Sequence, residues 1–276
     1  MGAEKGEMQL GLVGWPLEHT LSPVIHKAFL ESCGLSGRYR RYPVAPPELD
    51  SRLRELFDSG VLGLNVTFPH KRRAAGICSR LAAGSGRSPL PVINTMKMEE
   101  DGIITGYNTD THGFSRCLEA YGLEEPFLVA GCGGGAMAVE KALIEAGASY
   151  SVFCRDAGSW AGTAEPLGLH MLEGELDRAP GGTLVNATTI GWSDDDLFPL
   201  AGESLSGKTF MDLNYNPSWK WRRALIEFGV RVRTGELMLV AQAAESFRIW
   251  TGIRPDEEIG MRIIGSTRES GENVGN

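Results

Sequence analysis

Apolar and polar positions along the chain fall into blocks that predict strands and helices in alternation. A helix is expected to begin at Ser22, which can act as its N-cap with Pro23 at the first helical position, and to end before Gly34. The other blocks of the first half predict strands at residues 8–13, 38–44, 61–66, 92–98 and 103–106, and helices at 47–57 and from after 110 to about 121. The last two strands are expected to form a hairpin across residues 100–102.

The alternation starts again after Gly122, which indicates a second domain. The second half predicts strands at residues 127–130, 150–154, 183–187, 209–213 and 230–232, and helices at 136–146, 221–228 and 237–250. Strands that alternate with helices in this way are typical of α/β proteins with mostly parallel sheets.

Length and charge narrow the classes of function. The 276 residues are enough for two domains with sizeable cores, and the formal net charge of −8 gives no basic footprint for nucleic acid. The chain has no run of about 18 apolar residues, so no membrane span is expected. The N-terminus is short and polar before the first strand, and we therefore expect a cytoplasmic protein.

The cysteines and histidines give no sign of a disulfide framework or a metal site. The five cysteines are odd in number and widely spaced, without a Cys-x-x-Cys pair, and the five histidines lack a spacing such as His-Glu-x-x-His. We expect no disulfide framework and no metal. Cys132 is interpreted as a small side chain, His26 as a packing or capping residue, and His70 as solvent-exposed.

A glycine-rich stretch follows the predicted strand at 127–130. Gly131-Cys132-Gly133-Gly134-Gly135-Ala136 matches the dinucleotide fingerprint G-x-G-x-x-G/A, with Ala136 in the last place. Glycine lets the backbone turn tightly and approach a pyrophosphate, which would meet the positive end of the following helix. The alternative is a merely structural turn, but the context of strand, turn and helix favours nucleotide binding.

The end of the next strand bears on the choice between NADP and NAD. NAD binders carry an acidic residue there for the ribose 2′-hydroxyl, whereas NADP binders favour arginine. Here the strand ends in Cys154-Arg155-Asp156. Arg155 can pair with a 2′-phosphate, although the carboxylate of Asp156 would repel it. NADP is favoured over NAD.

The stretch Asn65-Val66-Thr67-Phe68-Pro69-His70-Lys71 carries the first candidate for catalysis. Pro69 has no N–H for the strand ladder, so it should stop the strand and place Lys71 on a stiff turn at the strand's C-terminal end. Open α/β sheets bind ligands at such ends. Taken alone, the stretch favours an ordinary surface lysine in a loop, beside Arg72 and Arg73.

Motifs in the right order along most of the chain resemble those of the shikimate dehydrogenase family, from about Gly11 to Gly252. They are Gly-Trp-Pro-Leu-Glu-His-Thr-Leu-Ser-Pro at 14–23, Asn-Val-Thr-Phe-Pro-His-Lys at 65–71, Val-Ile-Asn-Thr at 92–95, Gly-Tyr-Asn-Thr-Asp at 106–110, Asn-Ala-Thr-Thr-Ile-Gly at 186–191, Asp-Leu-Asn-Tyr-Asn-Pro at 212–217 and Gly-Glu-Leu-Met-Leu-Val-Ala-Gln at 235–242.

The resemblance implies an α/β protein of two domains. An N-terminal α/β substrate domain would comprise residues 1–110 with a returning C-terminal helix at 236–264, and a Rossmann doubly wound nucleotide-binding domain would comprise 111–235. Residues 265–276 are expected to be a disordered tail.

The resemblance also implies a role for each motif. Lys71 would be the catalytic acid/base, with Asp110 beside it, and Thr20 and Ser22 would bind the substrate carboxylate. The other substrate contacts would be Asn65, Thr67, Asn94, Asp110, Tyr215 and Gln242. The cofactor would be bound by residues 131–136, Arg155, Asp156, Thr188, Leu213, Gly235 and Met238.

The activity implied is the reversible NADPH-dependent reduction of 3-dehydroshikimate to shikimate in chorismate and aromatic amino acid biosynthesis, by a monomer or homodimer. Thr20 departs from the family's serine, which could shift ring selectivity, whereas Ser22 favours shikimate over quinate. The alternatives are an NAD(P)-dependent quinate or aminoshikimate dehydrogenase, or a catalytically silent NADP-binding regulator, against which the retention of Lys71 and Asp110 speaks. The segment Trp219-Lys220-Trp221 has no functional interpretation from the sequence.

Overall fold

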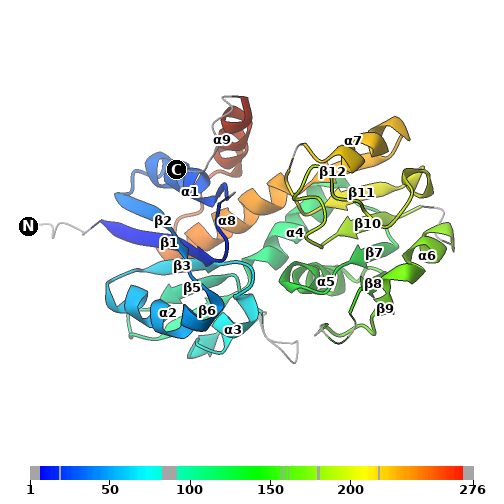
Figure 1. Ribbon diagram of the computed structural model, residues 1–276. Helices are drawn as coiled ribbons and strands as arrows, with labels where there is room; N and C mark the ends of the chain where they lie inside the picture. Colours follow the sequence, from blue (N-terminus) through cyan, green and yellow to red (C-terminus); the bar gives the residue numbers. More distant parts are fainter. Residues whose placement is uncertain are drawn as a thin grey trace, which may run out of the picture. The chain divides into compact units, whose positions relative to one another are not determined.

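The computed structural model describes residues 7–269 except 19, 83–91, 157, 159, 161, 179–180 and 217. The chain divides into two compact units, Met1–Thr109 with Leu239–Asn276 and Asp110–Met238. Strands and helices alternate through both units (Figure 1), which confirms the α/β class expected from the sequence. None of the helices in the described part of the chain has the length and hydropathy that a membrane span requires.

The first unit is built on a mixed sheet. Within its described residues six strands lie in the order β2-β1-β3-β5-β6-β4. Their bounds are β1 Met8–Gly14, β2 Gly37–Pro43, β3 Gly63–Val66, β4 Arg80–Leu81, β5 Thr95–Met98 and β6 Ile104–Tyr107. Strand β1 pairs in parallel with β2 and β3, whereas β5 pairs antiparallel with β3 and β6. The pairing of β5 with β6 confirms the hairpin expected at this point.

Helices pack against the sheet of the first unit. They are α1 Ser22–Ser32, α2 Leu49–Asp58, α3 Lys71–Ala75, most of α8 Glu236–Thr251, and α9 Glu257–Glu269. Helix α8 lies close to β5, because the indole Nε1 of Trp250 donates a hydrogen bond to the Met96 carbonyl at 3.0 Å, and it also lies close to Gly63 of β3. A Cβ on Gly63 would lie 2.2 Å from that indole nitrogen, so this approach of helix to sheet requires glycine.

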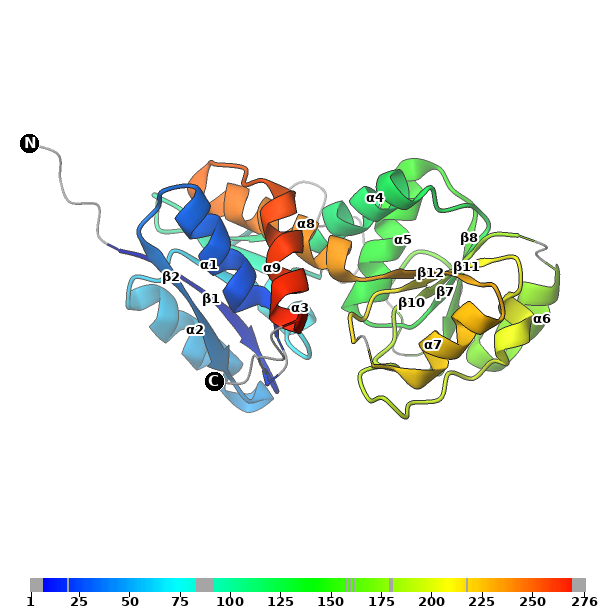
Figure 2. The same cartoon turned by 90° about the horizontal axis from the view of Figure 1, so that it is seen from above.

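Helix α9 corrects the expectation for the C-terminus. The chain leaves α8 at Gly252, whose φ is +78°, and then forms α9, which lies beside α1 (Figure 2). Ile264 of α9 is buried, and so is Gly260, where a Cβ would lie 2.8 Å from Val240. The helix continues to Glu269, so the tail expected to be disordered from Gly265 does not begin there. Residues 270–276 lie outside the described residues.

The second unit is built on a parallel sheet. Among its described residues six strands lie in the order β12-β11-β10-β7-β8-β9. Their bounds are β7 Phe127–Ala130, β8 Tyr150–Cys154, β9 Leu167–Gly168, β10 Thr183–Asn186, β11 Thr209–Asp212 and β12 Arg231–Thr234. All neighbours pair in parallel, and the order reverses between β7 and β10. This is the doubly wound Rossmann arrangement, in which ligands bind at the carboxyl ends of the strands beside the point of reversal.

Helices cover both faces of the second sheet (Figure 2), and each face has its own core. The helices are α4 Thr109–Tyr121, α5 Gly134–Ala146, α6 Leu172–Arg178 and α7 Lys220–Glu227. Val129 and Val185 point to the face with α4 and α5, whereas their neighbours Leu128 and Leu184 point to the face with α6 and α7. The strands are therefore apolar on both sides, as the continuous hydrophobic runs in the sequence indicate.

His26 of α1 lies in an aromatic cluster of the first unit. Its ring is fully buried and stacks on Tyr39 with centroids 4.2 Å apart, and it also contacts Phe247 and Trp250. Burial lowers the pKa of His26 to about 3, against an opposing effect of the Asn65 side chain. His26 is thus a packing residue, as expected.

The buried imidazole predicts acid sensitivity. The unfolded chain takes up a proton at His26 near pH 6.5, whereas the folded chain does so only near pH 3. The folded state therefore loses stability as pH falls between these values, by about 1.4 kcal/mol per pH unit from this group. Replacing His26 by phenylalanine should remove that contribution. Urea unfolding of both proteins from pH 7 to pH 4 would measure it, and parallel stability curves would contradict it.

Candidate active site

Lys71 lies at the start of α3, directly after the turn that ends β3. The turn is closed by hydrogen bonds from the Thr67 N–H to the Val13 carbonyl, 2.9 Å, and from the His70 N–H to the Thr67 carbonyl, 2.9 Å. The Lys71 carbonyl in turn accepts the N–H of Ile93 at 3.2 Å. The structure therefore confirms that the lysine is held by a fixed turn at the end of a strand.

His70 was expected to be solvent-exposed, and this prediction is wrong. Its side chain is 2% exposed, and Nε2 lies 2.7 Å from the Val44 carbonyl oxygen. The contact joins the turn before Lys71 to the end of β2. Nothing in the sequence indicated burial, because His70 is followed by three basic residues and its partner is a backbone carbonyl 26 positions away in the chain.

A buried hydrogen-bond network brings three of the predicted substrate-binding residues of the first unit together. Asn94 is its centre: Oδ1 accepts the N–H of Thr109 at 2.7 Å, and Nδ2 donates to the Thr109 hydroxyl at 2.9 Å and to Gln242 Oε1 at 3.3 Å. Asn65 Nδ2 donates to the hydroxyl of Ser246 at 3.0 Å, which lies 3.0 Å from that of Thr109. Asn65, Asn94 and Gln242 therefore belong to one cluster.

The sequence reasoning missed several members of this network. Thr95, whose hydroxyl accepts a hydrogen bond from Asn65 Nδ2 at 3.0 Å, and Thr109 each lie next to a predicted residue in the sequence, which could have suggested them. Ser246 lies one helical turn after Gln242 and accordingly on the same face of α8. Tyr39, whose hydroxyl donates to Asn65 Oδ1 at 2.8 Å, comes from β2 and carried no such signal.

Thr20 and Ser22 lie at the start of α1 and are both buried. The Thr20 hydroxyl accepts the N–H of Ser22 at 3.3 Å, so the two side chains share one turn. Burial raises the pKa of Tyr39 well above its usual range, with an opposing effect of the Ser22 hydroxyl. Ser22 thus lies beside the tyrosine that contacts Asn65. Thr67 packs its methyl group against Gly14, where a Cβ would approach within 2.4 Å.

Asp110 is buried in the first turn of α4, next to Thr109 in the chain. The hydrogen bond from the Thr109 N–H to Asn94 therefore fixes the backbone that carries Asp110. A carboxylate in the first turn of a helix is favoured by the helix dipole.

The glycine-rich loop of the second unit connects β7 to α5. Gly131 has a φ of +131°, and a Cβ there would lie 2.6 Å from the Ala187 carbonyl oxygen. Gly133 is the N-cap of α5, and no atom lies within 4 Å of the place where its Cβ would be. The loop therefore exposes the N-terminal backbone of α5 beside the reversal of strand order, where the residues fit a dinucleotide pyrophosphate.

A disulfide joins Cys132 of this loop to Cys154 at the end of β8, with Cα atoms 5.6 Å apart. The expectation that Cys132 is only a small side chain, outside any disulfide, is therefore wrong. Strands β7 and β8 are parallel neighbours with Ala130 opposite Phe153, so the residues that follow them lie together. The sequence did not show this proximity, because the two cysteines are 22 positions apart.

Arg155 and Asp156 follow β8, on the unit that carries the glycine-rich loop. Arg155 is exposed, whereas Asp156 Oδ1 accepts the N–H of Gly158 at 3.0 Å. The carboxylate thus stabilises its own turn. Across the described residues, no group of three or more His, Cys, Asp or Glu side chains could hold a metal ion.

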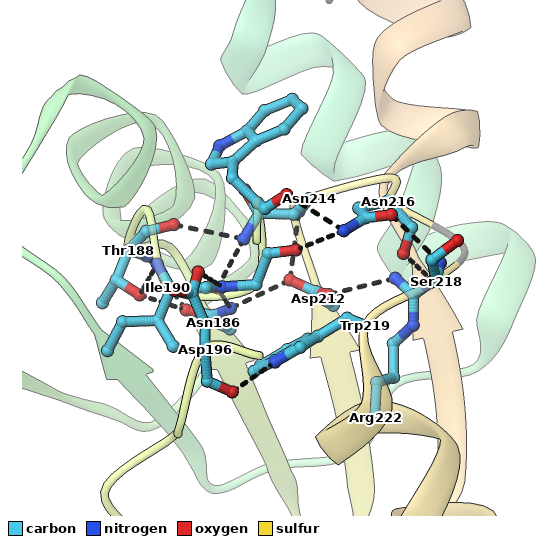
Figure 3. A network of polar contacts seen from close by, with 12 residues as sticks. Asn186, Thr188, Ile190, Asp196, Asp212, Asn214, Asn216, Ser218, Trp219 and Arg222 are labelled. Carbon is cyan, nitrogen blue, oxygen red and sulfur yellow. Dashed lines mark hydrogen bonds and ion pairs between the residues drawn. The ribbon is translucent and has the colours of Figure 1, made fainter. Parts of the chain in front are cut away.

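The loops after β10 and β11 carry three more of the predicted residues, Thr188, Leu213 and Tyr215, and Figure 3 shows the hydrogen bonds around Thr188. Thr188 donates its hydroxyl to Asn186 Oδ1, and its carbonyl accepts Nδ2 of Asn214 at 3.3 Å. Leu213 packs against Gly235, where a Cβ would lie 2.0 Å from the Leu213 carbonyl oxygen. The loop after β10 and the loop after β11 are therefore joined.

Tyr215 and Met238 differ in their surroundings. Tyr215 contacts the ring of Trp192 edge-on with centroids 5.0 Å apart, and burial raises the pKa of Tyr215 to about 12. Met238 belongs to the core on the α4 and α5 face of the sheet.

Comparison with known proteins decides the family. Residues 12–88 match the family model described as the shikimate dehydrogenase substrate binding domain, and residues 235–263 match the shikimate 5′-dehydrogenase C-terminal domain. The chain is 39% identical over 267 residues to the shikimate dehydrogenase (NADP(+)) of Rubrobacter xylanophilus, which covers 91% of this chain and 93% of that protein. The chain belongs to the shikimate dehydrogenase family.

Solved structures of shikimate dehydrogenases have the same fold. The enzyme from Aquifex aeolicus aligns with a TM-score of 0.83 and 26% identity over 95% of this chain and 99% of that one. The Thermus thermophilus enzyme in complex with NADP(H) and shikimate aligns with a TM-score of 0.77 and 33% identity over 93% and 99%. A quinate dehydrogenase from Corynebacterium glutamicum in complex with NAD is also similar, with a TM-score of 0.80 and 25% identity over 94% and 99%.

Proposed function

We propose that this protein is an NADP-dependent shikimate dehydrogenase, which catalyses the reversible reduction of 3-dehydroshikimate to shikimate. Two hydrogen bonds from neighbouring residues carry the proposal in a chain of this family: Asn94 accepts the N–H of Thr109, the residue before Asp110, and Ile93 donates its N–H to the Lys71 carbonyl. The first unit holds the substrate and the second the cofactor. The reaction belongs to chorismate and aromatic amino acid biosynthesis, and a cytoplasmic location remains a prediction.

Lys71 is the group that moves a proton. When bound, NADPH supplies the hydride that reduces the substrate carbonyl. The ammonium of Lys71 donates a proton to the carbonyl oxygen, and in the reverse direction the neutral amine accepts the proton of the hydroxyl. The carboxylate of Asp110 attracts the ammonium and orients it.

Buried polar groups hold the substrate. The hydroxyls of Thr20 and Ser22 bind the substrate carboxylate, with Tyr215 as a further contact. The ring hydroxyls and carbonyl are bound by Asn65, Thr67, Asn94 and Gln242. Because Asn94 already bonds to Thr109 and Gln242, its orientation is set before the substrate arrives. Polar groups matched to each hydroxyl discriminate against analogues that lack it.

The second unit provides the cofactor contacts. Residues 131–136 and the start of α5 hold the pyrophosphate, and the guanidinium of Arg155 pairs with the 2′-phosphate. Leu213, Gly235 and Met238 would border the nicotinamide, and Thr188 would be a further cofactor contact. The relatives named as NADP(+)-dependent support this choice over NAD.

A quinate dehydrogenase that uses NAD is the second candidate, because a solved structure of one has the same fold. Initial rates with shikimate and quinate, each with NADP⁺ and NAD⁺, would separate the two. We expect the highest kcat/KM for shikimate with NADP⁺, and a preference for quinate with NAD⁺ would contradict the proposal. A protein that turns over none of the four combinations would be a silent regulator instead.

Replacing Lys71 by alanine tests the proton transfer. Turnover should fall by roughly 10²-fold or more, as expected for a positioned acid/base, whereas shikimate affinity measured by calorimetry should change little. The matched control is Lys27→Ala, which removes an exposed lysine of α1. Unchanged turnover in Lys71→Ala would refute its role.

Replacing Arg155 by alanine tests the cofactor choice. The KM for NADPH should rise by roughly 10-fold or more, because one charge-assisted contact to the 2′-phosphate is lost, and the KM for NADH should stay the same. Arg262→Ala, which removes an exposed arginine of α9, is the control. Equal effects on the two cofactors would remove Arg155 from the 2′-phosphate site.

A further inference from the structure

Arg222 lies in the first turn of α7, and its guanidinium is buried. One end of the fork, Nη1, donates to Asp212 Oδ2 at 3.1 Å, and the other, Nη2, donates to the Asn216 carbonyl (Figure 3). Asp212 is the last residue of β11, and Asn216 comes four positions later. A single side chain therefore fastens both ends of the loop that carries Leu213 and Tyr215.

Each anchor of this loop is bonded to other parts of the second unit. Asp212 Oδ1 accepts Nδ2 of Asn186 at 2.9 Å and the N–H of Asn214 at 3.1 Å. Asn216 Nδ2 donates to the carbonyls of Gly191 and Trp192 at 3.1 and 3.0 Å. We call the two hydrogen bonds of Arg222, to Asp212 and to Asn216, the clamp. Through its two anchors the clamp is connected to the loop after β10, including Trp192, which contacts Tyr215.

The tryptophans of the segment 219–221 fix the start of α7, the helix that carries Arg222. Trp219 is fully buried, and its indole Nε1 donates to the Asp196 carbonyl at 2.7 Å. Its ring packs against Phe210 and Trp221, with centroids 6.2 and 5.2 Å away. A Cβ on Gly191 would lie 2.7 Å from the Trp219 ring. The segment that had no functional interpretation from the sequence therefore anchors the start of α7.

We propose that Arg222 is a positioning residue for Tyr215: by fastening the loop from Asp212 to Asn216, it fixes the position of the tyrosine, which is a substrate contact in the proposed function. The inference rests on the proposed function. Lysine cannot replace the arginine, because an ammonium is a point charge on a flexible stem and does not span two acceptors with the planar geometry of a guanidinium. Lysine does keep a positive charge beside Asp212, so it leaves the buried carboxylate compensated.

The test compares Arg222→Lys with Arg223→Lys, which makes the same change at the exposed neighbour on α7. Arg222→Lys should raise the KM for shikimate by about 10-fold, whereas the Kd for adenosine 2′,5′-bisphosphate should stay within about 2-fold, because this probe carries the 2′-phosphate assigned to Arg155 but lacks the nicotinamide assigned to Leu213. Arg223→Lys should match the wild type in both measurements. A general loss of structure would weaken nucleotide binding as well, so the split separates positioning from folding.

A double-mutant cycle with Tyr215→Phe makes the test specific to the tyrosine. If Arg222 acts through Tyr215, Arg222→Lys should change the KM for shikimate by less than about 2-fold once the hydroxyl is gone. Equal effects of Arg222→Lys with and without the hydroxyl would overturn the inference, and so would an unchanged KM in the single variant.

The inference can fail separately from the proposed function. A wild-type protein that does not oxidise shikimate would refute the proposed function itself. An active wild type whose Arg222→Lys variant behaves like Arg223→Lys would refute the inference alone. Should Arg222→Lys not fold, Asp212→Asn is the second variant, because it removes the charge at one anchor and keeps the shape of the side chain. For the inference to stand, Asp212→Asn must raise the KM for shikimate and leave the Kd for adenosine 2′,5′-bisphosphate unchanged.

Discussion

The first unit depends on the buried side chain of Asn94. Its amide oxygen accepts the backbone N–H of Thr109, and its amide nitrogen donates to Thr109 and Gln242. The hydrogen bonds of this one amide join three segments that are distant in sequence: the start of β5, the start of α4 and the middle of α8. A buried amide that lost these partners would leave donors and acceptors unsatisfied, which costs about 1–3 kcal/mol for each group. The same network thereby fixes Asn65, Asn94 and Gln242, which are proposed to bind the substrate, and Thr109, the residue before Asp110.

In the second unit, a buried charged side chain, Asp212, joins separate segments of the chain. Asp212 is fully buried, and burial raises the pKa of Asp212 to about 6 in spite of the Asn214 N–H and the Arg222 guanidinium, which oppose the rise. The carboxylate nevertheless has a partner for each oxygen. Its position at the end of β11, one strand from β10 at the reversal of strand order, lets it join the loops after β10 and β11. The asparagines at 186, 214 and 216 then complete the connection through backbone carbonyls.

The sequence predicted the parts of the fold that depend on local pattern. The alternation of apolar blocks predicted the α/β class, Pro69 predicted the end of β3, and the glycine-rich stretch predicted the turn between β7 and α5. It did not predict partners that only the tertiary structure brings together. His70 finds a carbonyl in another segment, Cys132 meets Cys154 across two neighbouring strands, and Arg222 reaches Asp212 from the next helix. Ser246 could have been predicted from the sequence, because it follows Gln242 by one helical turn. Tyr39 could not, because it lies on another strand and its spacing from Asn65 in the sequence does not indicate a contact.

The most direct test of the account is a crystal structure of this protein with shikimate and NADP⁺ bound. The account predicts that Lys71 Nζ lies within hydrogen-bond distance, about 2.6–3.2 Å, of the substrate hydroxyl oxygen whose carbon faces the nicotinamide. In the same crystal structure, the carboxylate of shikimate should accept hydrogen bonds from the hydroxyls of Thr20 and Ser22. A structure in which Lys71 points to solvent while another side chain contacts that oxygen would contradict the central claim.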